Sequence, residues 1–167
     1  SESGPMWLLA NVGDSRAYRF VDDELEQVSV DHSVVQEMVD AGEISRAAAA
    51  VHPSRNVITR ALGGAALPGG VSGEADYFLL PLASAERLLL CSDGVSGMID
   101  DEQIRRILAE HEDPRDAAER VVAAAVEAGG HDNATAVVVD VVGLAHTDPY
   151  DSVAQRQSLE QKLGALP

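Results

Sequence analysis

A short apolar strand that ends on a carboxylate constrains this chain more than any other segment. Leu88–Leu90 is a wholly apolar run, which is typical of a buried strand. Cys91 and Ser92 end the run, and Asp93 and Gly94 follow at once. An aspartate is seldom buried unless it is paired or bound to a metal. The sequence therefore predicts that Asp93 holds a partner at the rim of the core.

The length and composition indicate a single globular domain with a substantial core. The chain has 167 residues, of which 46% are hydrophobic, and its formal net charge is −16. That charge makes nucleic acids and anionic membranes poor partners and favours cations. No apolar run approaches the roughly 18 residues that a membrane span needs. The single cysteine, Cys91, excludes an internal disulfide and fits a reducing compartment, so we expect a cytoplasmic protein with no membrane contact from this segment.

Strand and helix patterns are mixed along the chain, and the predicted fold class is therefore α+β. We expect Met6–Val12 and Arg16–Val21 to form a hairpin, and Glu74–Leu80 to pair with Arg87–Ser92 across a short turn. Further strands are expected over 25–30 and 134–142, and a glycine-rich loop over 63–73. Helices are expected over 34–39, over 44–51, after the capping Asp100, and from Pro114 to the Gly129-Gly130 stop.

Three acidic turns share one design, in which an aspartate at a strand end lies beside a glycine. They are Asp14 after Gly13, Asp93 before Gly94, and Asp132 after Gly129-Gly130-His131. If the three strands are neighbours in one sheet, the three carboxylates converge at one edge. Oxygen ligands of this kind suit Mg²⁺ or Mn²⁺ rather than zinc. The residues leave open the alternative that each aspartate only caps its own turn.

Five short blocks follow one another along the chain: ANVGDSRAY at 10–18, DHS at 31–33, HPSRNVITRALG at 52–63, LCSDG at 90–94 and GGHDNAT at 129–135. In type, order and spacing, this set resembles the metal-dependent protein phosphatases of the 2C type, in their bacterial form. The blocks cover about residues 7–142, and the specificity lies in the ordered set rather than in any single block.

The resemblance implies part of a four-layer αββα sandwich, in which two antiparallel sheets are flanked by helices. We divide the chain into a flexible lead-in (1–5), the C-terminal part of a phosphatase domain (6–142, with a flap-like segment over 33–56) and a polar tail (143–167). The implied activity is hydrolysis of phosphoserine and phosphothreonine in proteins by a metal-activated water. The implied cofactors are two Mn²⁺ or Mg²⁺ ions, with a third in bacterial members. The implied partners are phosphorylated proteins, such as a Ser/Thr kinase or its substrates, in signal transduction.

Carried over by position, Asp93 and Asp132 are ligands of the main metal centre, and Asp14 serves the third, weaker site. Asn133 is expected to orient Asp132 without binding the metal itself, and Gly94 is expected to lie against the same site.

In the flap-like segment, Arg55 and His52 are candidate contacts for substrate. The residues themselves favour a structural or surface role for His32, His52 and His131, and pairing with carboxylates for Arg16 and Arg60.

The early motifs of the family are absent from these 167 residues. They are an arginine that grips phosphate, an N-E-D block, and a D-G-x-G-G block whose aspartate bridges the two metals. We therefore expect the catalytic residues upstream of this chain, and weak or no activity from the chain alone. The alternative is a non-catalytic, phosphatase-like remnant that binds or regulates a partner.

Gly13-Asp14-Ser15 after a strand also resembles the opening of lipolytic hydrolases that use a serine nucleophile. Ser15 would then need a histidine base, which those enzymes take from a D-x-x-H block. None of the five histidines has an aspartate three residues before it. The sequence therefore disfavours this reaction class.

Overall fold

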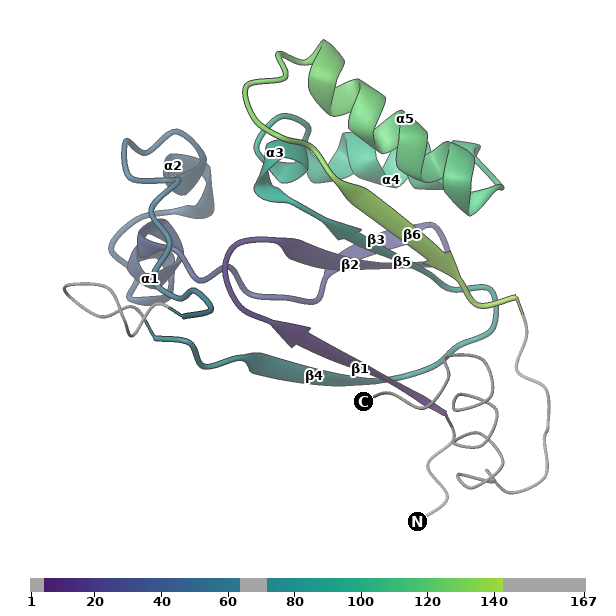
Figure 1. The fold of residues 1–167 in the computed structure, drawn as a ribbon, viewed down its shortest axis with the longest axis horizontal. Helices are drawn as coiled ribbons and strands as arrows, with labels where there is room; N and C mark the ends of the chain where they lie inside the picture. Colours follow the sequence, from purple (N-terminus) through teal and green to yellow (C-terminus); the bar gives the residue numbers. More distant parts are fainter. Residues whose placement is uncertain (1–4, 64–71, 143–167) are drawn as a thin grey trace, which may run out of the picture.

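A computed structural model describes residues 5–63 and 72–142 of the chain, in two antiparallel sheets with helices over the larger one (Figure 1). The strands are β1 (Met6–Asn11), β2 (Arg16–Val21), β3 (Glu24–Gln27), β4 (Asp76–Pro81), β5 (Arg87–Cys91) and β6 (Ala136–Asp140). The helices are α1 (Val34–Asp40), α2 (Arg46–Ala50), α3 (Asp93–Ser96), α4 (Asp101–Glu110) and α5 (Pro114–Glu127). The predicted α+β class is confirmed. Most of the expected lead-in, most of the glycine-rich loop and the polar tail lie outside the described residues.

The strand pairing predicted from the sequence is wrong at two places. β1 pairs with β4, and the second sheet has the order β3-β2-β5-β6. The chain therefore changes sheet between β1 and β2, and again between β4 and β5, where the sequence predicts hairpins. Leu8 faces Leu79 in the small sheet, and Tyr18 faces Leu89 in the large one. Alternation along a strand shows which face is buried but not which strand is its partner, and this explains the error.

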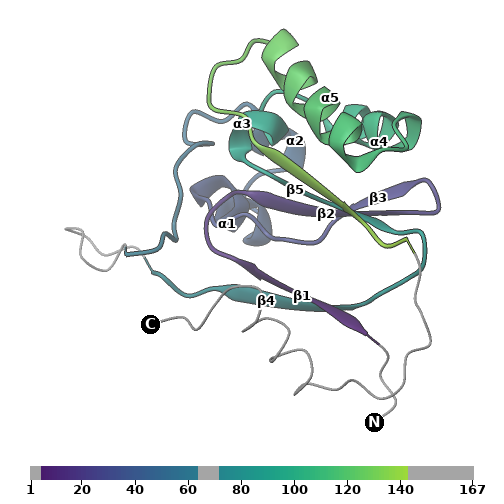
Figure 2. The ribbon, with the colours of Figure 1, turned by 45° about the vertical axis from the view of Figure 1, so that its right-hand side comes forward.

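The main core lies between the four-stranded sheet and the helices α3, α4 and α5. Tyr18 and Leu89 point from the sheet into this layer, and Ile104 and Val121 meet them from α4 and α5; all four are fully buried. Burial of such side chains is the dominant favourable term in folding. Figure 2 shows the helices standing on one side of this sheet, while β1 and β4 lie on the other side.

Both long helices begin at the caps that the sequence predicts. Asp100 caps α4 through the Gln103 N–H, and the Gln103 side chain returns the contact, so that the capping box is complete. Asp113 caps α5 directly before Pro114. None of the helices in the described part of the chain is long and apolar enough to cross a bilayer.

Two apolar sheet faces are left uncovered by the described residues. On the outer face of the small sheet, Leu8, Tyr77 and Leu79 are 66%, 71% and 64% exposed. On the four-stranded sheet, Leu90 and Val137, which are paired across β5 and β6, are also exposed. Neighbouring apolar residues that remain exposed on one face often mark a surface that another polypeptide covers.

Candidate metal centre

The strand register places the three acidic turns at one end of the four-stranded sheet. Arg16 at the start of β2 faces Cys91 at the end of β5, and Cys91 faces Ala136 at the start of β6. Asp14 precedes β2, Asp93 follows β5 and Asp132 precedes β6, so all three belong to this end. It is the left-hand end of the sheet in Figure 1, beside α3. The sequence predicts that the strand before Asp14 belongs to this sheet, but β2, the strand after Asp14, occupies that place.

Asp14 and Asp93 form a pair of carboxylates that influence each other electrostatically. Burial raises the pKa of the half-buried Asp14, and the negative charge of Asp93 raises it further. Both effects raise the free energy of the ionised form of Asp14. A divalent cation held by oxygen ligands would relieve this cost, so the donor chemistry of the pair fits Mn²⁺ or Mg²⁺.

Ser92 ties the Asp93 turn to the turn that contains Asp132. Its N–H donates to the Thr135 carbonyl at 3.1 Å, and its hydroxyl accepts from the Thr135 N–H at 3.0 Å. The same hydroxyl donates to the Asn133 carbonyl at 3.1 Å. These three bonds extend the β5–β6 pairing beyond the strands and bring the two acidic turns side by side.

Gly94 allows the closest approach between these turns. A Cβ atom built on Gly94 would lie 2.3 Å from the Asn133 carbonyl oxygen and 2.8 Å from its carbon. No side chain fits at such a distance, so the contact requires glycine. The residue therefore lies directly against the backbone that carries Asp132 and Asn133.

Asp93 and Asp132 are both exposed, and each accepts a hydrogen bond from the next residue. The Gly94 N–H donates to Asp93 Oδ1 at 2.9 Å, and the Asn133 N–H donates to Asp132 Oδ1 at 2.7 Å. Within residues 5–63 and 72–142, no group of three or more Asp, Glu, His or Cys side chains is arranged to hold a metal ion. The assignment of Asp14, Asp93 and Asp132 as metal ligands, and of Asn133 as the residue that orients Asp132, stays a prediction.

The two candidate substrate contacts lie in the loop after α2. His52 is half-buried, and its Nδ1 accepts the Ser54 N–H at 3.1 Å, while its carbonyl accepts the Arg55 N–H at 3.1 Å. His52 thus shapes the turn that presents the exposed Arg55. Contact of either residue with substrate stays a prediction.

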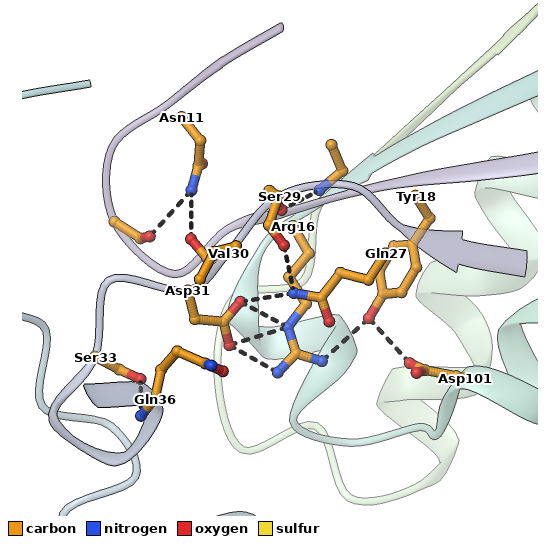
Figure 3. A network of polar contacts seen from close by, with 12 residues as sticks. Asn11, Arg16, Tyr18, Gln27, Ser29, Val30, Asp31, Ser33, Gln36 and Asp101 are labelled. Carbon is orange, nitrogen blue, oxygen red and sulfur yellow. Dashed lines mark hydrogen bonds and ion pairs between the residues drawn. The ribbon is translucent and has the colours of Figure 1, made fainter. Parts of the chain in front are cut away.

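Arg16 is bound to a carboxylate, as the sequence predicts (Figure 3). Its Nε and Nη2 donate to both oxygens of Asp31, at 2.7 to 3.1 Å, and its Nη1 donates to the Tyr18 hydroxyl at 3.1 Å. The Tyr18 hydroxyl in turn donates to Asp101 at 3.0 Å. Although burial favours the neutral form, the hydrogen bond to Asp31 holds the pKa of Arg16 above its usual value. Arg16 therefore supports the start of β2.

Asp76 and its contacts beside the Asp14 turn are not predicted from the sequence. Asp76 lies between His32 Nε2, at 3.0 Å, and Arg60 Nη1, at 2.7 Å. His32 is 4% exposed and contacts Gly13. The structural role predicted for His32 and the carboxylate pairing predicted for Arg60 are confirmed. Two of the five blocks hold His32 and Arg60, but no sequence signal pointed to Asp76.

A two-sheet α+β fold with acidic turns at one sheet end is the architecture that the resemblance implies for phosphatases. Residues 4–134 match the family described as protein phosphatase 2C. This match covers more than half of the chain, and the chain therefore belongs to the protein phosphatase 2C family.

Similar proteins carry serine/threonine phosphatase names. The chain is 38% identical over 133 residues to the serine/threonine phosphatase stp of Listeria innocua, covering 80% of this chain and 51% of the relative. It is 40% identical over 134 residues to the serine/threonine protein phosphatase PstP of Mycobacterium tuberculosis, covering 80% of this chain and 25% of the relative. The chain thus spans about half the length of the Listeria relative and about a quarter of the Mycobacterium tuberculosis relative.

Solved structures of bacterial serine/threonine phosphatases share the fold. The Mycobacterium tuberculosis phosphatase PstP/Ppp superposes with a TM-score of 0.74 at 34% identity, over 84% of this chain and 57% of that chain. The catalytic domain of PstP in complex with two manganese ions superposes with a TM-score of 0.71 at 36% identity, over 84% of this chain and 55% of that one.

Proposed function

We propose that this chain is the C-terminal part of the catalytic domain of a metal-dependent phosphatase, which hydrolyses phosphoserine and phosphothreonine in proteins. The observation that carries the proposal is the family match, supported by a strand register that assigns the turns of Asp14, Asp93 and Asp132 to one end of the four-stranded sheet. The named activity of the relatives supports the same reaction class.

The residues at this end of the sheet have separate tasks in the proposed enzyme. When bound, Mn²⁺ or Mg²⁺ lowers the pKa of a water and neutralises charge on the phosphoryl oxygens. Asp93 and Asp132 would hold the main ions, and Asp14 would serve a third. Asn133 would orient Asp132. Arg55, on the exposed loop beyond α2, would meet the phosphoprotein.

We also propose that the catalytic domain is incomplete in these residues. The exposed apolar faces around Leu8, Tyr77 and Leu79, and around Leu90 and Val137, support this, because a finished sandwich buries both faces of each sheet. In this proposal, residues 6–142 are one portion of the domain, and the segment over 33–56 acts as the flap. The expected partners are phosphorylated proteins of a kinase pathway in the cytoplasm.

Hydrolysis of a phosphothreonine peptide tests the proposal. Phosphate release is measured with Mn²⁺ and with EDTA, for this chain alone and for the longest polypeptide that its gene encodes. We expect little turnover from this chain alone and EDTA-sensitive turnover from the longer polypeptide. Asp93→Asn and Asp132→Asn in the longer polypeptide should each lower kcat by about 100-fold or more, because loss of a residue that only orients a metal ligand already costs about 10- to 100-fold.

Two results would change the conclusion. Robust EDTA-sensitive turnover by this chain alone would contradict the incomplete domain. The second result is that the longest polypeptide encoded by the gene folds but also fails to hydrolyse phosphopeptides. That result would favour the non-catalytic phosphatase-like module.

A further inference from the structure

Gly13, the residue before Asp14, is held on both of its peptide groups by one histidine. The backbone N–H of His32 donates to the Gly13 carbonyl at 3.0 Å, and the Gly13 N–H donates to His32 Nδ1 at 3.0 Å. The Gly13 carbonyl also accepts from Asn11 Nδ2 at 3.2 Å, but among the described residues His32 alone binds the Gly13 N–H. Gly13 is buried and has φ of 107°, a conformation that other residues rarely adopt. Glycine has little preference of its own for this conformation, so the turn depends on its partners.

The far side of the imidazole is fixed by other segments. Because Nδ1 accepts a hydrogen bond, the neutral ring carries its proton on Nε2. Nε2 then donates to Asp76 Oδ2 at 3.0 Å, and Arg60 donates to the other oxygen of Asp76 at 2.7 Å. The His32 carbonyl accepts the Thr59 N–H at 2.8 Å. β4 and the segment that follows the flap therefore determine how the ring faces Gly13.

We propose that His32 is a positioning residue, which anchors Gly13 and thereby holds the Asp14 turn beside the Asp93 turn at this end of the sheet. The inference rests on the proposed function only in that Asp14 is a metal ligand. Asp14 directly follows Gly13, so the conformation of Gly13 sets where the Asp14 carboxylate lies; two carboxylates at one sheet end repel each other, and either gains hydration by turning outward. A turn built on glycine would allow that movement unless another group held it.

Two variants separate the two sides of the ring. His32→Asn keeps an acceptor near the place of Nδ1 but no longer reaches Asp76. His32→Gln keeps a donor directed at Asp76 but has no acceptor beside Gly13. Ser29→Ala is the matched control, because it removes another buried hydrogen bond, with the Ala17 N–H, and does not touch Gly13.

Amide hydrogen exchange at Gly13, measured by NMR on the 167-residue chain without metal, tests the anchor. We expect exchange about tenfold faster in His32→Gln, the factor associated with one lost hydrogen bond, and within about threefold of the unmodified chain in His32→Asn and Ser29→Ala. Unchanged exchange in His32→Gln overturns the inference. The same acceleration in Ser29→Ala also overturns it, since that result indicates general loosening.

Broadening of the Asp14 and Asp93 amide signals by Mn²⁺ tests the consequence for metal binding. We expect His32→Gln to need about tenfold more Mn²⁺ than the unmodified chain, and His32→Asn to stay close to it. If His32→Gln loosens Gly13 but binds Mn²⁺ equally well, the positioning role is overturned and the proposed function stands. If the unmodified chain shows no broadening at Asp14 and Asp93, the consequence for metal binding is overturned for this chain, the proposed function is left to the phosphopeptide assay of the longer polypeptide, and hydrogen exchange decides the anchor.

Discussion

Single residues at the candidate site act mainly through their backbones. Gly94 contributes no side chain, yet it decides how near the Asp93 turn comes to Asn133. The Ser92 hydroxyl bonds to backbone groups of the neighbouring turn. These contacts bring together the chain segments that carry Asp93 and Asp132. The side chains of the site therefore depend on small neighbours that carry no chemistry themselves.

Replacement of Gly94 by alanine tests this dependence. Alanine has the higher helix propensity, and Gly94 lies in α3, so local preference alone predicts a gain of stability. The new Cβ would lie 2.3 Å from the Asn133 oxygen, and we expect a net loss of about 1–3 kcal/mol in the free energy of unfolding, as for other overpacked sites. Urea denaturation measures the change.

Gly73→Ala is the control for this substitution. Its Cβ would lie 3.6 Å from the Ala61 carbonyl, an ordinary contact, and we expect a change within about 0.5 kcal/mol. Equal effects of the two substitutions would contradict the close approach assigned to Gly94.

At the scale of elements, buried ion pairs connect strands and helices that the sequence separates widely. Arg87 in β5 donates to Asp140 in β6 and to the carbonyls of Leu108, His111 and Glu112 at the end of α4. Glu86 accepts from Trp7 in β1 and Arg19 in β2, and so links the two sheets. These charges are stable at the core because their polar atoms are hydrogen-bonded.

Asp76 gives β4 a pH-dependent link to the Asp14 turn. The hydrogen bonds from His32 and then from Arg60 lower its pKa below the usual value. A lowered carboxyl pKa contributes stability above the unfolded value of about 3.9, and this contribution is lost as the pH falls through the folded value. Asp76→Asn removes the charge but keeps the shape.

We therefore expect Asp76→Asn to be less stable than the unmodified chain between pH 5 and 7, and the difference to shrink below about pH 4. Urea denaturation over a pH series measures it. Asp40→Asn, at the end of α1, is the control. Its loss of stability relative to the unmodified chain should be smaller than that of Asp76→Asn. A gap between Asp76→Asn and the unmodified chain that widens at low pH would contradict the assigned contacts.

At the scale of the whole molecule, the net charge of −16 opposes compactness. Salt screens charge repulsion, with a Debye length of about 10 Å at 0.1 M and about 3 Å at 1 M. We expect Tm to rise by about 2–4 °C between 0.02 and 0.5 M NaCl, which corresponds to about 1 kcal/mol for a chain of this size. Thermal unfolding followed by circular dichroism measures it. KCl is the control and should raise Tm by a similar amount, because screening does not depend on the identity of the monovalent cation. A fall of Tm with both salts would contradict the prediction.

Local patterns determined much of this protein. The caps Asp100 and Asp113, the helical stripes behind them and the apolar run at Leu88–Leu90 specify elements through contacts within a few residues, so their signals are complete in the sequence. The five ordered blocks were sufficient to predict the family, which the comparison confirms. The glycine beside each aspartate also indicated where carboxylates approach the sheet end.

Only the tertiary structure decided which strands are neighbours. Alternation at β1 and β4 is equally compatible with a hairpin partner or a distant one, because it specifies a face and not a partner. The contact of His32 with Gly13, and of Asp76 with both His32 and Arg60, joins residues up to 44 positions apart. Such contacts arise from packing and desolvation of the whole chain. For that reason the Asp93 turn was predictable, while the surroundings that position Asp14 opposite Asp93 were not.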